Sequence, residues 1–389
     1  MSVMSITSID KEYVAGTYGR FPVEIVSGKG SILMDSDGKE YIDMGSGIGV
    51  TAFGNCDESW VYAVTAQLNK LQHVSNLYYT EPCALLAKAL CEKSGMKKVF
   101  FGNSGAEANE CAIKAARKYS AEKKGGDCYT IITLVSSFHG RTLTTLAATG
   151  QDHFHKLFNP LTPGFVHVPA NDIAALEAAV ASVNPAGLMM ECVQGEGGVL
   201  PLTAEFIQAA EKLCKEKDIP LIIDEVQTGN GRTGAFYAYQ NFGITPDIVS
   251  TAKGLGGGLP IGACLLGDKV ESVLGPGDHG STYGGNPVAC AGALNVVERI
   301  DDKLLEEVKA KSEYIFSALE GAEGVEGVSG MGLMIGIKTT KPAKDVLMAC
   351  MAEGVLCLTA KDKLRLLPAL NIPMKTLETA IAVIKAACK

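Results

Sequence analysis

Short apolar runs alternate with longer amphipathic stretches between about residues 85 and 275, and this alternation limits the possible fold more than any other feature. The apolar runs have the length of strands, and the stretches between them have the pattern of helices. Short buried strands that alternate with helices form a mostly parallel sheet with helices on both faces, so the sequence predicts an α/β fold. We expect strands at 99–101, 129–134, 186–193, 221–223 and 247–250, and helices over 106–118 and 204–217.

The two ends of the chain have a different pattern. Near the N-terminus, β-rich segments flank a turn sequence at residues 36–39, which is typical of a hairpin. We expect two domains, a large one over residues 46–285 and a small α+β domain that combines residues 1–45 with 286–389. The terminal elements are expected as strands at 22–26, 31–34, 40–43, 333–337 and 364–367, helices over 288–300 and 302–319, and a last helix.

Composition and charge argue against several classes of protein. With 35 basic and 43 acidic residues among 389, the net charge is −8, and no basic patch for nucleic acid is visible. No apolar run reaches the roughly 18 residues of a membrane span, and residues 1–5 lack the pattern of a secretory signal. The twelve cysteines include no C-x-x-C pair and the six histidines no H-E-x-x-H, so we expect a reduced, cytoplasmic chain without a metal site.

Many of the 44 glycines cluster in loops that follow predicted strands. In open α/β sheets, ligands bind beyond the carboxyl ends of the strands. In the first such loop, residues 102–110, small residues at a helix N-terminus favour an anion site, to which Ser104 adds a hydroxyl donor. The alternative is a helix cap, because Ser104 and Glu107 have the spacing of a capping box.

Two later loops place an acid and a lysine at strand ends. Asp224 follows the apolar residues 221–223 and needs a cationic partner there. That partner is either a magnesium ion, although the motif G-x-x-x-x-G-K-[ST] is absent, or the protonated ring nitrogen of a cofactor. Lys253 follows residues 247–250 and is surrounded by glycines. Most lysines are solvated at the surface, but a desolvated amine loses its proton more easily and forms a Schiff base.

The remaining loops add an aromatic ring and more charges. Phe138 offers a flat face and Arg141 a fork for a carboxylate, with a core phenylalanine and a solvated arginine as the alternative. Glu191 and Glu196 lie at and beyond a strand end. A phosphate cradle, a flat face, an acid and a lysine fit pyridoxal phosphate. A dinucleotide fits poorly because no early strand is followed by G-x-G-x-x-G.

The motifs that carry this chemistry resemble those of the class III aminotransferases over nearly the whole chain. This family has the fold-type I architecture of pyridoxal-phosphate enzymes. The resemblance departs from the family pattern at Cys192, where proline is usual, and at residues 54–58, where G-N-C-D-E replaces G-H-x-H-P. The shared motifs are N-S-G-A-E-A-N-E (103–110), S-F-H-G-R-T (137–142), Q-G-E-G-G (194–198), D-E-V-Q-T-G-N-G-R-T-G (224–234), A-K-G-L-G-G-G-L-P-I-G (252–262), H-G-S-T-Y-G-G-N-P (279–287) and L-R-L-L-P (364–368).

The resemblance implies a role for each residue around the cofactor ring. Lys253 would form the Schiff base and move protons, and Asp224 would keep the pyridinium nitrogen protonated. Val226 and Phe138 would cover the two faces of the ring, and Gln227 would meet its phenolic oxygen.

The resemblance also implies a phosphate site that needs two subunits. Ser104, Gly105 and Ala106 would bind the cofactor phosphate from one subunit. Thr282 would reach the phosphate held by the other subunit, so we expect a homodimer with shared active sites.

Within the class, the chain is most similar to the group that acts on N2-acetyl-L-ornithine, through its length and the segments at 17–22, 47–50 and 75–82. The expected reaction is ping-pong transfer of the terminal amine to 2-oxoglutarate, a step of arginine biosynthesis. Arg141 would bind the distant carboxylate, and Arg365 the one beside the keto carbon. Glu196 would pair with Arg365 while acetylornithine is bound and swing away for 2-oxoglutarate. Tyr18 is expected at the substrate.

Other readings stay open. Ornithine, 4-aminobutyrate or succinyldiaminopimelate could be the amino donor, since their aminotransferases share the lysine, the aspartate and the two arginines. The changed residues 54–58 could alter the substrate entrance. A ligand-binding protein that keeps the fold without catalysis is the alternative from another class, and the intact Lys253, Asp224 and Gln227 argue against it.

Overall fold

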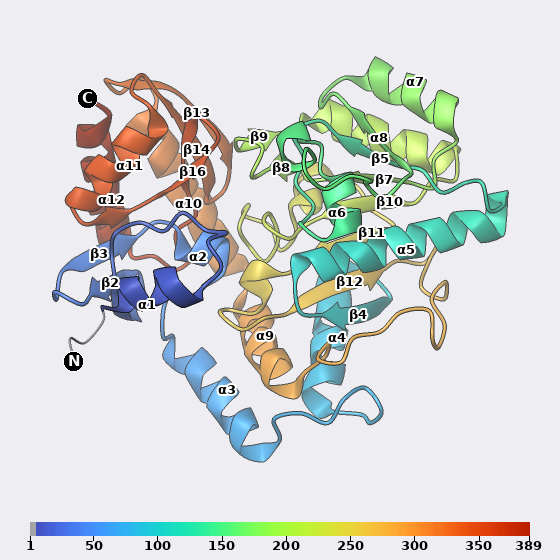
Figure 1. Cartoon of the computed structure of the whole chain (residues 1–389), viewed down its shortest axis with the longest axis horizontal. Helices are drawn as coiled ribbons and strands as arrows, with labels where there is room; N and C mark the ends of the chain where they lie inside the picture. The colour runs from blue at the N-terminus through green and yellow to red at the C-terminus, as the bar shows by residue number, and fades with distance from the viewer. Residues whose placement is uncertain (1–4) are drawn as a thin grey trace.

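A sheet of seven strands in the order β4-β12-β11-β10-β7-β5-β6 forms the centre of the computed structural model, which describes residues 5–389 (Figure 1). Neighbouring strands run parallel except around β12, which is antiparallel to both β11 and β4. The mostly parallel sheet is therefore confirmed, although the sequence did not predict β12. The strands are β4 (Lys98–Gly102), β5 (Ile131–Leu134), β6 (Phe165–Val168), β7 (Gly187–Met190), β10 (Leu221–Asp224), β11 (Ile248–Thr251) and β12 (Gly262–Leu266).

Alternate residues of the central strands enter separate cores on the two faces of the sheet. Ile222 and Ile248 pack with residues of the long helix α5 (Gly105–Lys124). Ile223 and Val249 point to the opposite face, where they pack with α8 (Ala204–Glu216). Helices therefore cover both faces, as the sequence predicts. The other helices of this region are α6 (Leu143–Ala148) and α7 (Ile173–Val183), and three-residue to five-residue 3₁₀ turns occur at Asp152–Phe154, Ala238–Phe242 and Lys253–Leu255.

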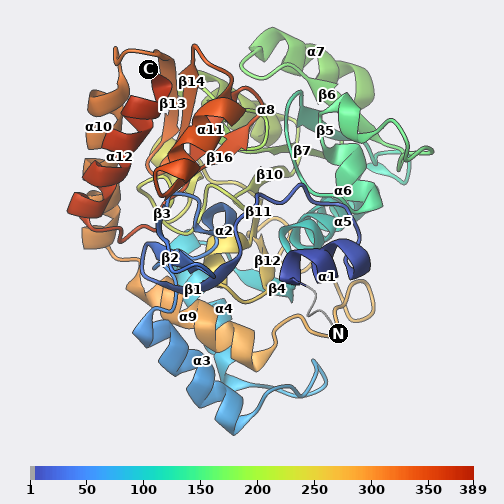
Figure 2. The same cartoon turned by 60° about the vertical axis from the view of Figure 1, so that its left-hand side comes forward.

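The two ends of the chain meet in a second region that contains two small sheets (Figures 1 and 2). In one sheet, β3 of the N-terminal hairpin strands pairs in parallel with β15 from the C-terminal part. The other sheet has the order β13-β14-β17-β16. The domain boundaries at 45 and 285 stay predictions. The strands are β1 (Ile25–Lys29), β2 (Ile32–Asp35), β3 (Glu40–Asp43), β13 (Val325–Met331), β14 (Met334–Thr339), β15 (Val355–Leu356), β16 (Leu358–Ala360) and β17 (Lys363–Leu366).

The last three helices of the chain pack against these sheets, whereas the helix Pro287–Arg299 packs with the helices Glu58–Lys70 and Glu81–Ser94. The predicted helices over 288–300 and 302–319 are confirmed, and they are separated by Asp301, whose carboxylate accepts the backbone N–H of Leu304 at 2.8 Å and caps the second helix. The predicted last helix is also confirmed. The helices are α1 (Ile6–Tyr13), α2 (Ser46–Gly49), α3 (Glu58–Lys70), α4 (Glu81–Ser94), α9 (Pro287–Arg299), α10 (Asp302–Leu319), α11 (Ala343–Ala352) and α12 (Met374–Cys388).

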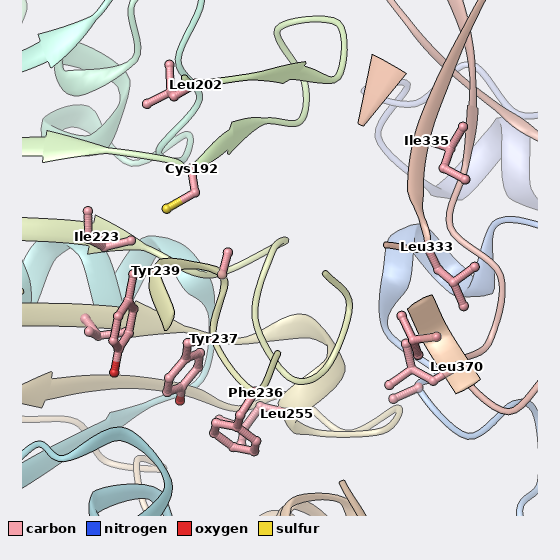
Figure 3. Close-up of a cluster of buried hydrophobic side chains, with 14 of the residues drawn as sticks. Cys192, Leu202, Ile223, Phe236, Tyr237, Tyr239, Leu255, Leu333, Ile335 and Leu370 are labelled. Atoms are coloured by element: carbon pink, nitrogen blue, oxygen red, sulfur yellow. The ribbon is translucent and has the colours of Figure 1, made fainter. Parts of the chain in front are cut away.

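One apolar core continues from the large sheet into the terminal region. Figure 3 shows Cys192, Leu202 and Ile223 on the side of the large sheet and Leu333, Ile335 and Leu370 on the side of the terminal region, and all six belong to one cluster of buried side chains. Cys192, which stands where the family usually has proline, is fully buried and is part of this packed core. All twelve cysteines are free thiols. Within residues 5–389, no helix is long and apolar enough to span a membrane. Residues 1–4, used in the expectation of no secretory signal, lie outside the described part.

The unusual segment at residues 54–58 connects structural elements. The Asp57 carboxylate accepts the backbone N–H of Trp60 at 3.0 Å and so caps α3. The same carboxylate receives two guanidinium hydrogen bonds from Arg299 of α9, at 2.5 and 3.0 Å. Burial works against its ionisation, but these bonds hold the pKa of Asp57 below its ordinary value.

We predict that Asp57→Ala lowers the free energy of unfolding by about 1–2 kcal/mol, the scale of a lost cap. Asp57→Asn keeps a cap acceptor and loses the charge. Because the folded-state pKa of Asp57 is lowered, the advantage of the wild type over Asp57→Asn should be present near neutral pH and disappear as the pH falls through that folded-state pKa. Chemical denaturation of the variants at several pH values tests this, and a difference that does not change with pH would contradict it.

Candidate active site

A cavity of about 440 Å³ lies at the edge of the large sheet where the parallel strands end. The loops after β4, β5, β7, β10 and β11 all contribute to its wall. Ten residues singled out in the sequence line it together: Ser104, Gly105, Ala106, Phe138, Arg141, Glu191, Asp224, Val226, Gln227 and Lys253.

Asp224, at the end of β10, is a buried carboxylate with an ordered set of donors. Its Oδ2 accepts the side-chain N–H of Asn109 at 2.8 Å and lies 2.8 Å from Nδ1 of His139. Its Oδ1 accepts the backbone N–H of Val226 at 3.0 Å. Among the ion pairs within residues 5–389, Asp224 takes part only in the one with His139, so no lysine or arginine neutralises it. Such a carboxylate is suited to a further cationic donor from the cavity.

Asn109 and His139 are two residues whose part in the site was not predicted. Both fall inside the motifs that the sequence analysis singled out, and Asn109 lies four residues after Gly105 on one face of α5. The spacing from Gly105 was the signal that could have found Asn109. The contact between His139 and Asp224 joins the loops after two different strands, so no local pattern announces it.

Lys253 lies directly after β11, and its backbone has a positive φ of 45°. A left-handed conformation is strained for a lysine and is often found at functional positions. Burial lowers the pKa of its amine, while the charges of Glu196 and Asp224 act in the opposite direction. A buried amine with a lowered pKa can act as a nucleophile and as a proton acceptor.

The N-terminus of α5 combines the two alternatives considered for residues 102–110. Ser104 caps the helix, because its hydroxyl accepts the backbone N–H of Glu107 at 3.2 Å. The next two N–H groups, of Gly105 and Ala106, belong to the first turn, where helix geometry leaves them without an internal acceptor. A Cβ at Gly105 would lie 2.6 Å from a methyl carbon of Val226, so glycine is required for this close approach. This cradle fits an anion.

The loop after β5 adds Phe138 and Arg141 to the wall of the cavity. The Phe138 loop is fixed by Glu191, whose carboxylate accepts the backbone N–H groups of Phe138 at 2.9 Å and Gly195 at 3.1 Å. Burial raises the pKa of Glu191 to about 7. The guanidinium of Arg141 lies 5.4 Å from the ring centre of Phe154, and Arg141 is exposed and free of ion pairs within residues 5–389. Arg141 is thus able to accept a carboxylate.

Arg365 is not among the residues that line the cavity, but it lies directly behind Gln227. Its Nη1 donates to Gln227 Oε1 at 3.2 Å and to Glu196 Oε1 at 2.6 Å. Only 3% of Arg365 is exposed, and its Nε finds no partner within residues 5–389. Burial opposes ionisation of Glu196, but the charge of Arg365 holds its pKa below the ordinary value. The pair predicted from the sequence is therefore present in this structure.

Two predicted residues lie away from the cavity of their own chain. Tyr18 is 69% exposed, and the guanidinium of Arg20 lies 5.7 Å from the centre of its ring. Thr282 is exposed and does not line the cavity. The expected roles of both residues stay predictions. Residues 54–58 do not line the cavity either, and their effect on the substrate entrance stays a prediction.

Comparison with known proteins gives the same family from three directions. The family described as "Aminotransferase class-III" matches residues 13–388. The acetylornithine aminotransferase of Haemophilus ducreyi is 52% identical over 99% of this chain and 98% of its own length, and that of Methanocaldococcus jannaschii is 44% identical over 98% and 97%.

Solved structures agree in fold. The N-acetylornithine aminotransferase of Stenotrophomonas maltophilia is 34% identical, with a TM-score of 0.85 over 98% of both chains. The ornithine aminotransferase of Toxoplasma gondii is 31% identical, with a TM-score of 0.94 over 98% of this chain and 93% of that one. The predicted fold-type I architecture is confirmed, and the chain belongs to the class III aminotransferases, a family of pyridoxal-phosphate-dependent enzymes.

Proposed function

We propose that this chain transfers the terminal amine of N2-acetyl-L-ornithine to 2-oxoglutarate, giving N-acetylglutamate 5-semialdehyde and L-glutamate, with pyridoxal 5′-phosphate as the cofactor. The observation that carries the proposal is one cavity with a buried acid, a lysine of lowered pKa and a free arginine, next to which a second arginine is covered by a glutamate. The names of the relatives from Haemophilus ducreyi and Methanocaldococcus jannaschii support acetylornithine as the donor.

The residues of the cavity fit pyridoxal phosphate. Asp224 would accept a hydrogen bond from the protonated ring nitrogen, and the positive charge of that ring would neutralise the carboxylate. Ser104, Gly105 and Ala106 would bind the phosphate, and Val226 and Phe138 would face the ring. When bound, the cofactor supplies an electron sink for the carbon that carries the transferred amine. The bound cofactor in the ornithine aminotransferase of Toxoplasma gondii supports this proposal.

Lys253 is the group that moves protons. It would hold the cofactor aldehyde between turnovers. Once released, its amine would take a proton from the substrate carbon and return it two atoms farther along, in a 1,3-proton shift. A general acid–base group within hydrogen-bond reach contributes about 10²–10⁴-fold to the rate. Burial favours this role because it makes the neutral amine accessible at lower pH.

The two arginines solve the problem of two different substrates in one site. Arg141 would bind the carboxylate far from the reacting atom in both half-reactions. Arg365 would bind the carboxylate beside the keto carbon of 2-oxoglutarate, as a bidentate pair. While acetylornithine is bound, Glu196 would keep Arg365 neutralised, because an uncompensated buried charge costs about 3–5 kcal/mol.

We infer a homodimer that acts in the cytoplasm. Leu77 and Tyr79 are strongly exposed apolar residues, and Tyr283 beside Thr282 is 63% exposed, which supports an apolar subunit interface on this side. A partner seated there would allow Thr282 to reach a second phosphate site. The twelve free cysteines support a reducing compartment.

The amino donor is tested by single-turnover titration of the loaded enzyme, followed by the visible absorbance of the cofactor. N2-Acetylornithine should convert the cofactor faster than ornithine, 4-aminobutyrate or succinyldiaminopimelate. A faster reaction with one of those three would assign that donor in its place. A cofactor band that no donor shifts would favour a binding protein without catalysis.

We predict that Lys253 alone holds the cofactor covalently. Borohydride reduction followed by peptide mapping should label the Lys253 peptide in the wild type and in the control Lys309→Ala. The amine of Lys309 lies at the surface and pairs with Glu306 on α10. Lys253→Ala should carry no label and should lose at least about 10²-fold in activity. Labelling at another lysine, or a purified protein that takes up no cofactor, would overturn the assignment.

We predict that Glu196→Gln slows the acetylornithine half-reaction at least about tenfold more than the 2-oxoglutarate half-reaction, since it leaves the Arg365 charge uncompensated only when the donor is bound. The control is Glu306→Gln, which removes an exposed carboxylate from an ion pair on α10 and should change neither half. Single-turnover rates for both halves provide the measurement. Equal losses in the two halves would argue against the gate.

A further inference from the structure

The loop that carries Glu196 lies across one face of the terminal-region sheet. Glu196 belongs to the residues between β8 (Val193–Gln194) and β9 (Leu200–Pro201), which pair as a short antiparallel hairpin. In the facing sheet, Ser329, Gly336 and Arg365 are direct partners in register on β13, β14 and β17. Side chains in such a row lie on the same face of a sheet.

Each position of the row meets one part of the loop. Arg365 donates to Glu196 at 2.6 Å. A Cβ at Gly336 would lie 2.8 Å from Cβ of Val199, so the missing side chain makes room for this valine. The Ser329 hydroxyl donates to the carbonyl oxygen of Val199 at 2.8 Å. The loop is therefore held at its acid and at its last residue by the same sheet.

Lys363 holds the serine in turn. Its Nζ donates to Ser329 Oγ at 2.7 Å. A serine hydroxyl that receives a bond from an ammonium group must direct its own hydrogen elsewhere, and the Val199 carbonyl is the acceptor within reach. The order of donors is thus fixed from Lys363 through Ser329 to Val199, and a bond in a chain of this kind is strengthened by its neighbour.

Val199 has a backbone conformation that needs such support. It is fully buried and has a positive φ of 51°. For a β-branched residue this is a true outlier, and strain of this kind persists only where the surroundings impose it. At the other end of the loop, the N–H of Gly195 is bound by Glu191 at 3.1 Å. The backbone is fixed at both ends, while the Glu196 side chain is 31% exposed.

We infer that Ser329, oriented by Lys363, is a positioning residue that fixes the backbone of the Glu196 loop. Glu196 then releases Arg365 by rotation of its side chain and not by movement of the loop. This inference rests on the proposed function. Its consequence is for donor selectivity. A fixed loop keeps Arg365 covered while a terminal amine reacts, and a loosened loop would expose Arg365 to the carboxylate beside the amine of L-glutamate.

The test uses the full-length loaded enzyme and four variants. Ser329→Ala removes the hydroxyl, Ser329→Thr keeps it, and Lys363→Met removes the ammonium that orients it. The matched control is Ser317→Ala, which removes a serine hydroxyl bond of 3.0 Å to the Tyr314 carbonyl on the outside of α10. Two quantities are measured: amide hydrogen exchange over residues 193–201, and the ratio of single-turnover rates with L-glutamate and with N2-acetylornithine.

Ser329→Ala should speed exchange over residues 193–201 about fivefold and raise the glutamate-to-acetylornithine ratio by a similar factor, the scale of one hydrogen bond. Lys363→Met should act in the same direction and less strongly. Ser329→Thr and Ser317→Ala should match the wild type in both measurements. A merely structural role for Ser329 would lower the thermal midpoint and both rates without changing their ratio.

Unchanged amide exchange over residues 193–201 in Ser329→Ala overturns the inference. It is also overturned if Glu196→Gln changes the glutamate-to-acetylornithine ratio and Ser329→Ala does not. If Glu196→Gln itself leaves the ratio unchanged, the gate in the proposed function is wrong, and the exchange measurement alone decides whether Ser329 fixes the loop. The two failures are therefore distinguishable.

Discussion

The buried carboxylate of Asp224 is the constraint on which the site depends. A charge with 3% exposure at the end of a central strand requires donors, which come from helix α5 through Asn109 and from the loop after β5 through His139. Neither donor is a permanent cation. In the proposed function, a cationic cofactor ring would neutralise the carboxylate, and the small residues, Phe138 and Lys253 line the same cavity.

Charge compensation also governs the second half of the site. Arg141 stands in the open and can bind or release a carboxylate at little cost, whereas Arg365 is almost completely buried and needs a partner at all times. Glu196 provides that partner from a loop that is fixed by the opposite sheet. In the proposed function, the free arginine and the covered arginine would together recognise two different substrates.

The sequence predicted most of the cavity because its chemistry is local to strand ends. Asp224, Lys253 and the residues around Ser104 each follow an apolar run directly, and parallel strands bring such ends to one edge. Strand β12 was missed because it runs against its neighbours and interrupts the βαβ pattern. The contacts of His139 with Asp224 and of Ser329 with Val199 join distant segments, and no periodicity encodes them. The roles of Tyr18 and Thr282 stay predictions, because neither residue lines the cavity of its own chain.

The pairing of β3 with β15 has a consequence for how the chain matures. More than three hundred residues separate the two strands, since β3 ends at Asp43 and β15 begins at Val355. During synthesis the N-terminal hairpin must wait for its neighbour until nearly the whole polypeptide has emerged from the ribosome. The central sheet can close earlier from its own contiguous segments. Arg365 follows β15 by only a few positions, so the last part to be made both completes the hairpin's sheet and brings in the second arginine.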